Sequence, residues 1–119
     1  MADNVVLSRQ SPLVTLHDPT ATVTYLGNIM FGAELSIPPM PGIRQVDPKL
    51  QRAPDGLWRP AADSPAIGSA EGNVADIKLD MDAQNRSGKR DVGADQRSDE
   101  PVQRGPLAAK DVGPPWFSR

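Results

Sequence analysis

The sequence predicts an all-β protein built from short strands that are joined by long loops. Its 119 residues include 13 prolines and 10 glycines, and proline breaks helix interiors because it lacks a backbone donor. Long helices, and with them an all-helical bundle, are therefore excluded. Apolar and polar residues alternate with a period of two in several short runs, which is typical of strands. The close spacing of these runs suits a solenoid whose coils turn at three corners.

The first third of the chain carries the clearest strand patterns. Strands are expected over residues 4–8, 13–17, 20–26 and 29–31. In the third of these, Thr20, Thr22 and Thr24 share one face, while Val23 and Tyr25 share the other. Gly27-Asn28 then supplies a turn. We therefore assign residues 1–35 to the coil strands of a single domain that spans residues 1–119.

The middle of the chain, residues 36–73, is rich in loops. Three prolines in residues 37–42 lack ladder donors, so this segment is expected to be an extended connector. A further extended segment is expected to begin at residues 47–50. Asp55-Gly56 indicates a turn before residues 57–59, and Ser64–Ile67 fits a single helical turn.

Residues 74–119 are polar with isolated apolar side chains, and we assign them to the last strands and a C-terminal cap. One strand is expected around residues 74–79 and another at 91–95. Trp116 and Phe117 are expected to form a structural cap by packing back on the body, because large aromatic side chains are costly to leave in water.

Composition excludes several function classes. The net charge of −2 argues against a nucleic-acid partner, which needs a clustered basic face. The chain has no cysteine, so it has no disulfide or thiolate chemistry. No apolar run approaches the roughly 18 residues of a membrane span. The first residues lack a basic segment and a long apolar segment, so no signal peptide is expected, and composition leaves the compartment unknown.

Two local groups are candidate binding sites. Trp58 beside Arg59 could stack on a sugar ring, and a buried core tryptophan is equally consistent with the pattern. Asp80 and Asp82 have the spacing of calcium ligands. The complete calcium loop fails, because its sixth and twelfth positions would be Asn85 and Asp91. The alternative is a structural loop in which Arg86 pairs with Asp80 or Asp82.

Other polar residues have plainer interpretations. His17 is the only histidine; it could act as a general base, but a solvated or capping role is favoured beside Asp18-Pro19. Tyr25 is expected in the core or at its rim. The run Lys89-Arg90-Asp91 is interpreted as a solvated face.

A series of phrases along the chain matches a known family. In order they are Gly27-Asn28-Ile29, Asp47-Pro48-Lys49-Leu50, residues 55–60, Ser64-Pro65-Ala66-Ile67, residues 80–86, Asp91-Val92-Gly93-Ala94-Asp95, Gly105-Pro106-Leu107 and residues 111–116. This series resembles the C-terminal end of the right-handed parallel β-helix polysaccharide lyases of the alginate lyase and chondroitinase B type. Gly68 and Gln96 stand where the family often has aspartate and glutamate.

The resemblance implies a fold and a substrate class. The fold would be the final coils of a right-handed parallel β-helix with an irregular C-terminal capping segment. The family's reaction is β-elimination on uronic-acid polysaccharides. Its catalytic lysine and arginine and its calcium ligands lie on earlier coils, so no catalytic residue is assigned here. The resemblance alone implies calcium as a cofactor, and it alone implies a secreted or periplasmic location.

The leading hypothesis is a non-catalytic structural or interaction module related to these lyases, with an acidic polysaccharide as a partner. The alternatives are a small oligomeric lyase that uses Lys49, Arg52 or His17, and a carbohydrate-binding module. The apolar N-terminal strands carry few charged residues to prevent edge pairing. They therefore predict a homo-oligomer that forms through those strands.

Overall fold

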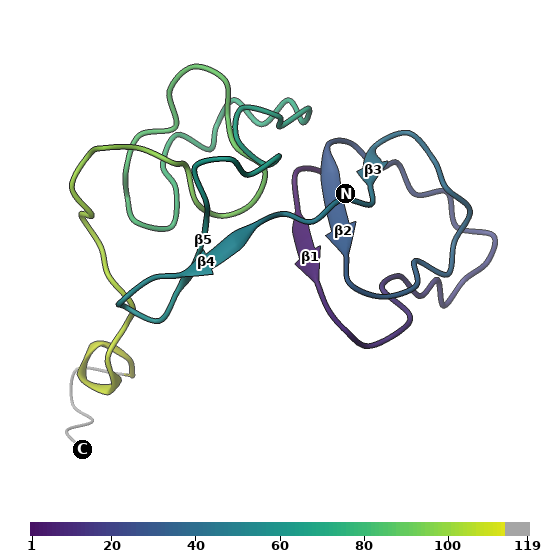
Figure 1. Cartoon of the computed structure of the whole chain (residues 1–119), viewed down its shortest axis with the longest axis horizontal. Coiled ribbons are helices and arrows are strands. Elements are labelled where there is room, and N and C mark those ends of the chain that lie inside the picture. The colour runs from purple at the N-terminus through teal and green to yellow at the C-terminus, as the bar shows by residue number, and fades with distance from the viewer. Residues whose placement is uncertain (114–119) are drawn as a thin grey trace.

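A three-stranded parallel sheet forms one half of the molecule. In the computed structural model, which describes residues 1–113, the strands β1 (Val5–Leu7), β2 (Asn28–Phe31) and β3 (Ile43–Arg44) lie in the order β1-β2-β3. The register places Val5 beside Ile29 and Ile29 beside Arg44. Figure 1 shows this sheet on the right, with the irregular segment 8–27 looping away from it. The sheet thus joins residues that are distant in the sequence.

An antiparallel hairpin begins the other half. β4 (Leu50–Arg52) pairs with β5 (Trp58–Pro60) around a turn that contains Asp55-Gly56. Residues 61–108 follow as turns and loops, and the described part of the chain ends with the single-turn 3-10 helix η1 (Ala109–Asp111). The hairpin and these loops lie on the left of Figure 1. Trp116 and Phe117, the expected cap, lie outside the described residues.

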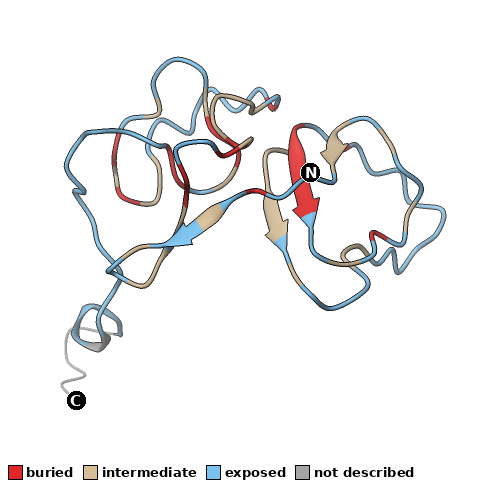
Figure 2. Ribbon diagram, in the orientation of Figure 1, coloured by how far each residue is buried: buried red, intermediate tan, exposed pale blue. Residues whose placement is uncertain are grey.

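The core is small and lies on both faces of β2. Neighbouring residues of a strand point to opposite faces of the sheet. Met30 accordingly packs with Tyr25 and Leu35 on one face, while Ile29 packs with Ala66 and Val92 on the other. Figure 2 shows β2 as the buried strand of the sheet. The apolar core therefore consists of two small clusters, one on each face of β2.

The buried amide of Asn28 joins three segments of the chain at the start of β2: residues 1–4, residues 26–28 and the segment that leads into β3. Its Nδ2 group donates to the carbonyls of Met1, Leu26 and Gly42 at 3.1–3.2 Å, and its Oδ1 accepts from Asn4. Gly42 itself has a φ of +89°, and a Cβ there would lie 1.9 Å from the carbonyl oxygen of Tyr25. Close backbone approach therefore requires glycine at residue 42.

The expectation of a right-handed parallel β-helix is wrong. Residues 1–113 form one three-stranded and one two-stranded sheet, neither of them closed, and no parallel β-helix is present in them. The expected strands at 13–17 and 91–95 are irregular. Within 20–26 only Leu26 forms an isolated bridge, to Ala2, and near 74–79 only Leu79 forms one, to Asn85. The chain also reverses at the hairpin instead of adding another parallel coil.

Other expectations are confirmed. Strands form within residues 4–8 and 29–31, and residues 37–42 contain no strand. Asp55-Gly56 turns the chain as expected, and the Ile67 N–H donates to the carbonyl of Ser64 at 3.2 Å, which closes the expected turn. Turn residues and β-branched residues favour these conformations locally, and the two strands are completed by pairing with each other.

We expect Asn28→Ala to lower the free energy of unfolding by about 1–3 kcal/mol, because the backbone N–H of Asn4 loses its acceptor and three carbonyls each lose one of their two donors. Urea unfolding measures the loss. Asn73→Ala, at an exposed asparagine, is the matched control and should change stability by less than about 0.5 kcal/mol. Equal effects of the two substitutions would contradict the role given to Asn28.

Candidate functional site

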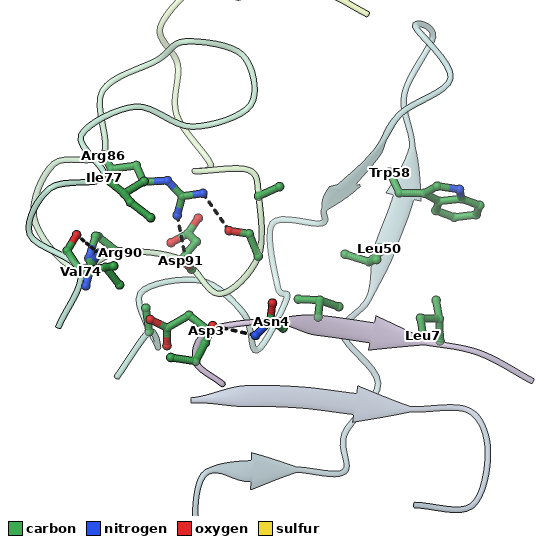
Figure 3. Close-up of a pocket in the computed structure, with 15 residues that line it drawn as sticks. Asp3, Asn4, Leu7, Leu50, Trp58, Val74, Ile77, Arg86, Arg90 and Asp91 are labelled. Atoms are coloured by element: carbon green, nitrogen blue, oxygen red, sulfur yellow. Dashed lines mark hydrogen bonds between the residues drawn. The ribbon is translucent and has the colours of Figure 1, made fainter. Parts of the chain in front are cut away.

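An open cavity of about 820 Å³ lies between β1, the hairpin and the loops of residues 70–94. Figure 3 shows Leu7, Leu50 and Trp58 on one side of it, and Arg86 and Arg90 on the other. Its walls are largely apolar side chains that remain exposed, such as Leu7 at 49% and Trp58 at 57%. A monomer seldom leaves so many large apolar groups in one hollow without a function.

The hairpin presents Trp58 and Arg52 on the same face. The antiparallel register places these two residues directly opposite one another, and such cross-strand pairs lie close together on one face. The Nε of Arg52 donates to the carbonyl of Gly56 at 3.3 Å. Within the described residues the guanidinium has no ion pair. An exposed indole beside an available guanidinium can therefore meet a ligand from solvent.

Arg59 has a different environment, because it lies on the opposite face of β5. Its guanidinium binds Asp55 at 2.7 Å, Asp95 at 3.2 Å and the buried carboxylate of Asp82. The pKa of Arg59 is raised, first by Asp82 and then by Asp55. The arginine that pairs with Asp82 is therefore Arg59. The expectation that Arg86 would pair with Asp80 or Asp82 is wrong in its choice of arginine.

The cluster shifts the pKa values of its carboxyl groups in opposite directions. Burial raises the pKa of Asp95 above its ordinary value, although the charge of Arg59 opposes this. The pKa of Asp55 is lowered, mainly by its bond to Arg59 and then by the Leu57 amide. Asp95 is buried whereas Asp55 is exposed, and this difference in solvation accounts for the difference in direction.

Asp80 closes its own loop. Its Oδ1 accepts the amides of Asp82 and Gln84 at 2.9 and 2.8 Å, and its Oδ2 accepts the amide of Gln96 at 3.1 Å. Because Asp82 is paired with Arg59, the oxygens of both candidate ligands are already engaged. In the described part of the chain no group of three or more acidic or histidine side chains could hold a metal ion. Asp80 and Asp82, as they are bonded here, therefore do not fit a calcium site.

Arginine side chains brace the far wall of the cavity. Arg86 donates to the carbonyl of Gly93 at 2.7 Å, and Arg90 donates to that of Val74 at 2.9 Å. Arg90 also binds the carbonyl of Gly72. Residues 89–91 are therefore more than the expected solvated face, since Arg90 holds a loop and Asp91 is buried. A carbonyl has no sequence signature, so local patterns could not reveal these contacts.

The remaining candidate residues are dispersed. Lys49 is exposed and bound to Asp63 at 2.6 Å. His17 is exposed in the irregular segment that precedes β2. No hydrogen bond or ion pair connects either of them with Arg52 among the described residues. Within residues 1–113, His17, Lys49 and Arg52 do not form an assembled base and cation for proton abstraction.

Comparison with known proteins supplies no relative. No family model matches the chain, and no curated protein or solved structure matches it significantly. None of the helices among residues 1–113 is long and apolar enough to cross a membrane. The function must therefore be argued from the cavity and the hairpin themselves.

We expect Asp95→Asn to alter how stability depends on pH. Because burial raises the pKa of Asp95, the folded state holds that proton more tightly than the unfolded chain. The stabilisation that this proton gives to the folded state is lost as the pH rises through the folded-state pKa of Asp95. As the pH rises above the ordinary range of an aspartate, which is about 4, the stability of the variant should therefore rise relative to that of the wild type.

Urea unfolding at a series of pH values measures this difference. Val102→Ala changes an exposed side chain without removing a titrating group, so its difference from the wild type should not vary with pH. If the difference in stability between Asp95→Asn and the wild type stayed constant with pH, burial would not raise the pKa of Asp95.

Proposed function

We propose that this chain is a non-catalytic module that binds an acidic polysaccharide of the uronic-acid class. The observation that carries the proposal is the cross-strand pair of Trp58 and Arg52 on the open face of the hairpin. The indole offers a flat apolar platform for a sugar ring. The guanidinium beside it offers two parallel donors to a carboxylate.

The resemblance to polysaccharide lyases supports the choice of ligand, although the fold that it implied is wrong. The matching phrases include residues 55–60, which form the turn and second strand of this hairpin. We therefore retain the family's ligand class and leave its architecture aside. Arg59 is left out of the proposed contact, because three carboxylates occupy its guanidinium.

Recognition without catalysis fits the arrangement of the charged side chains. β-Elimination needs a base at the proton beside the carboxylate and a cation at the carboxylate itself. Lys49 is paired with Asp63, and His17 lies on a separate segment. A sugar bound at Trp58 would therefore meet a cation without an assembled base. The proposed module holds a polysaccharide and leaves its bonds intact.

Binding of alginate and chondroitin oligosaccharides, measured by calorimetry, tests the proposal. We expect Trp58→Ala to weaken binding by about tenfold, the equivalent of about 1.4 kcal/mol. Arg52→Gln should weaken it too and should reduce its dependence on salt, because the lost contact is ionic. Both side chains are exposed, so the variants should fold normally.

Arg104→Gln is the matched control, since it removes one exposed positive charge elsewhere. If it weakens binding as much as Arg52→Gln does, attraction is diffuse and the proposed contact is wrong. Failure of the wild type to bind either acidic oligosaccharide would also refute the proposal. Release of unsaturated uronate product, seen by ultraviolet absorbance, would instead favour the lyase alternative.

A further inference from the structure

The turn of the hairpin sets the direction of the Arg52 guanidinium. Its Nε donates to the carbonyl oxygen of Gly56 at 3.3 Å, the one hydrogen bond that this side chain makes among residues 1–113. An arginine can hold a carboxylate along either of two edges, the pair of Nε and one Nη or the pair of Nη groups. Because Gly56 occupies Nε, only the two Nη groups remain for two parallel bonds. A carboxylate therefore meets Arg52 end-on.

The same bond keeps the tryptophan platform open. Arg52 and Trp58 lie directly opposite one another on the two strands, and a guanidinium in such a place is attracted to the face of an indole. Stacking there would cover the surface that a sugar ring needs. The bond to Gly56 instead holds the guanidinium at the turn, and Trp58 stays 57% exposed.

The turn is itself held in place on both sides. The N–H of Gly56 donates to the carbonyl of Ala53 at 2.9 Å, and the N–H of Ala53 donates to the carbonyl of Leu57 at 2.8 Å. Asp55 accepts the Leu57 amide at 3.0 Å with Oδ1 and binds Arg59 at 2.7 Å with Oδ2. Arg59 links the turn to the buried carboxylates described above. The Gly56 carbonyl therefore has a fixed position relative to β4.

Glycine supplies a backbone conformation at residue 56, and not merely space. Its φ is +85°, in the left-handed region where other residues are strained. A Cβ there would approach only the Nη2 of Arg52, at an ordinary contact distance of 3.8 Å. The direction of the Gly56 carbonyl is thus the feature that another residue would disturb.

We propose, on the basis of the proposed function, that Gly56 is a positioning residue of the binding face and that the group bound by Arg52 is the free carboxylate of a uronic acid, and not its ester. A methyl ester keeps the sugar ring for Trp58 but carries no charge and lacks the second strong acceptor that two parallel bonds require. Immobilising a long side chain on binding costs affinity. The Gly56 carbonyl lowers this cost, because it orients Arg52 before the ligand arrives.

Calorimetry with alginate oligosaccharides and with their methyl esters tests the choice of ligand. We expect the wild type to bind the free acid at least about tenfold more tightly than the ester, because hydrogen bonds to a charged group are lost. Equal affinity for the two ligands would overturn the assignment of the carboxylate to Arg52.

Variants of Gly56 test the positioning role. Gly56→Ala should weaken binding of the free acid about three- to tenfold, while Gly56→Asn should retain more affinity, because asparagine adopts positive φ more readily. Gly88→Ala is the matched control: Gly88 has a φ of +68° and no atom within 4 Å of its added Cβ, so the variant carries similar strain and should bind normally. With Arg52→Gln already present, Gly56→Ala should cause no further loss. An equal loss with and without Arg52 would overturn the role of Gly56.

NMR of the ligand-free protein separates this inference from the proposed function. In Gly56→Ala the Cδ protons of Arg52 should move upfield, because the released side chain stacks on the Trp58 ring, and in Gly88→Ala they should not move. Shifts that are the same in the wild type and in Gly56→Ala would overturn the positioning role. If the shifts behave as expected but no acidic oligosaccharide binds, the proposed ligand is wrong while the orientation of Arg52 by Gly56 stands.

Discussion

Buried carboxylates and amides hold this chain together, because it has too few apolar side chains to build one continuous core. The 25 Leu, Ile, Val and Phe residues are about a fifth of its length. Asp91 shows how polar groups replace them: it is 1% exposed and accepts the amides of Gly68 and Arg97 at 2.7 Å. Each such group supplies acceptors to loops that have no ladder of their own. The buried polar residues are Asn28, Ser64, Asp82, Gln84, Asp91, Asp95 and Gln96.

The same constraint positions the proposed binding face. Arg59 fastens one side of β5 to Asp82 and Asp95, which belong to loops far along the chain. Because successive side chains of a strand alternate between faces, fixing Arg59 inward turns Trp58 outward, opposite Arg52. The ion pairs therefore act as an anchor for the hairpin. The exposed side chains of the hairpin are left for recognition.

Part of this arrangement is predictable from sequence, and the reason for the rest is physical. The turn at Asp55-Gly56 and the strands near residues 4–8 and 29–31 follow from local preferences. Residues 20–26 alternate just as clearly, yet they form no strand, since a strand needs a neighbour with free ladder groups. Trp58 could be recognised as a candidate, but the partners of Arg59 are separated from it by long stretches of chain. Contacts with backbone carbonyls, such as those of Arg90, leave no pattern to find.

Buried carboxylates hold together loops that lack a continuous apolar core, and Asp91→Asn tests this role most directly. The amide keeps the shape of the side chain but turns a donor toward the amide of Arg97 or Gly68, which leaves a buried N–H without an acceptor. We predict a loss of about 1–3 kcal/mol in the free energy of unfolding in urea. Asp99→Asn, at an exposed aspartate, should have almost no effect. If Asp91→Asn were as stable as the wild type, the apolar clusters around β2 would be sufficient and the claim would be wrong.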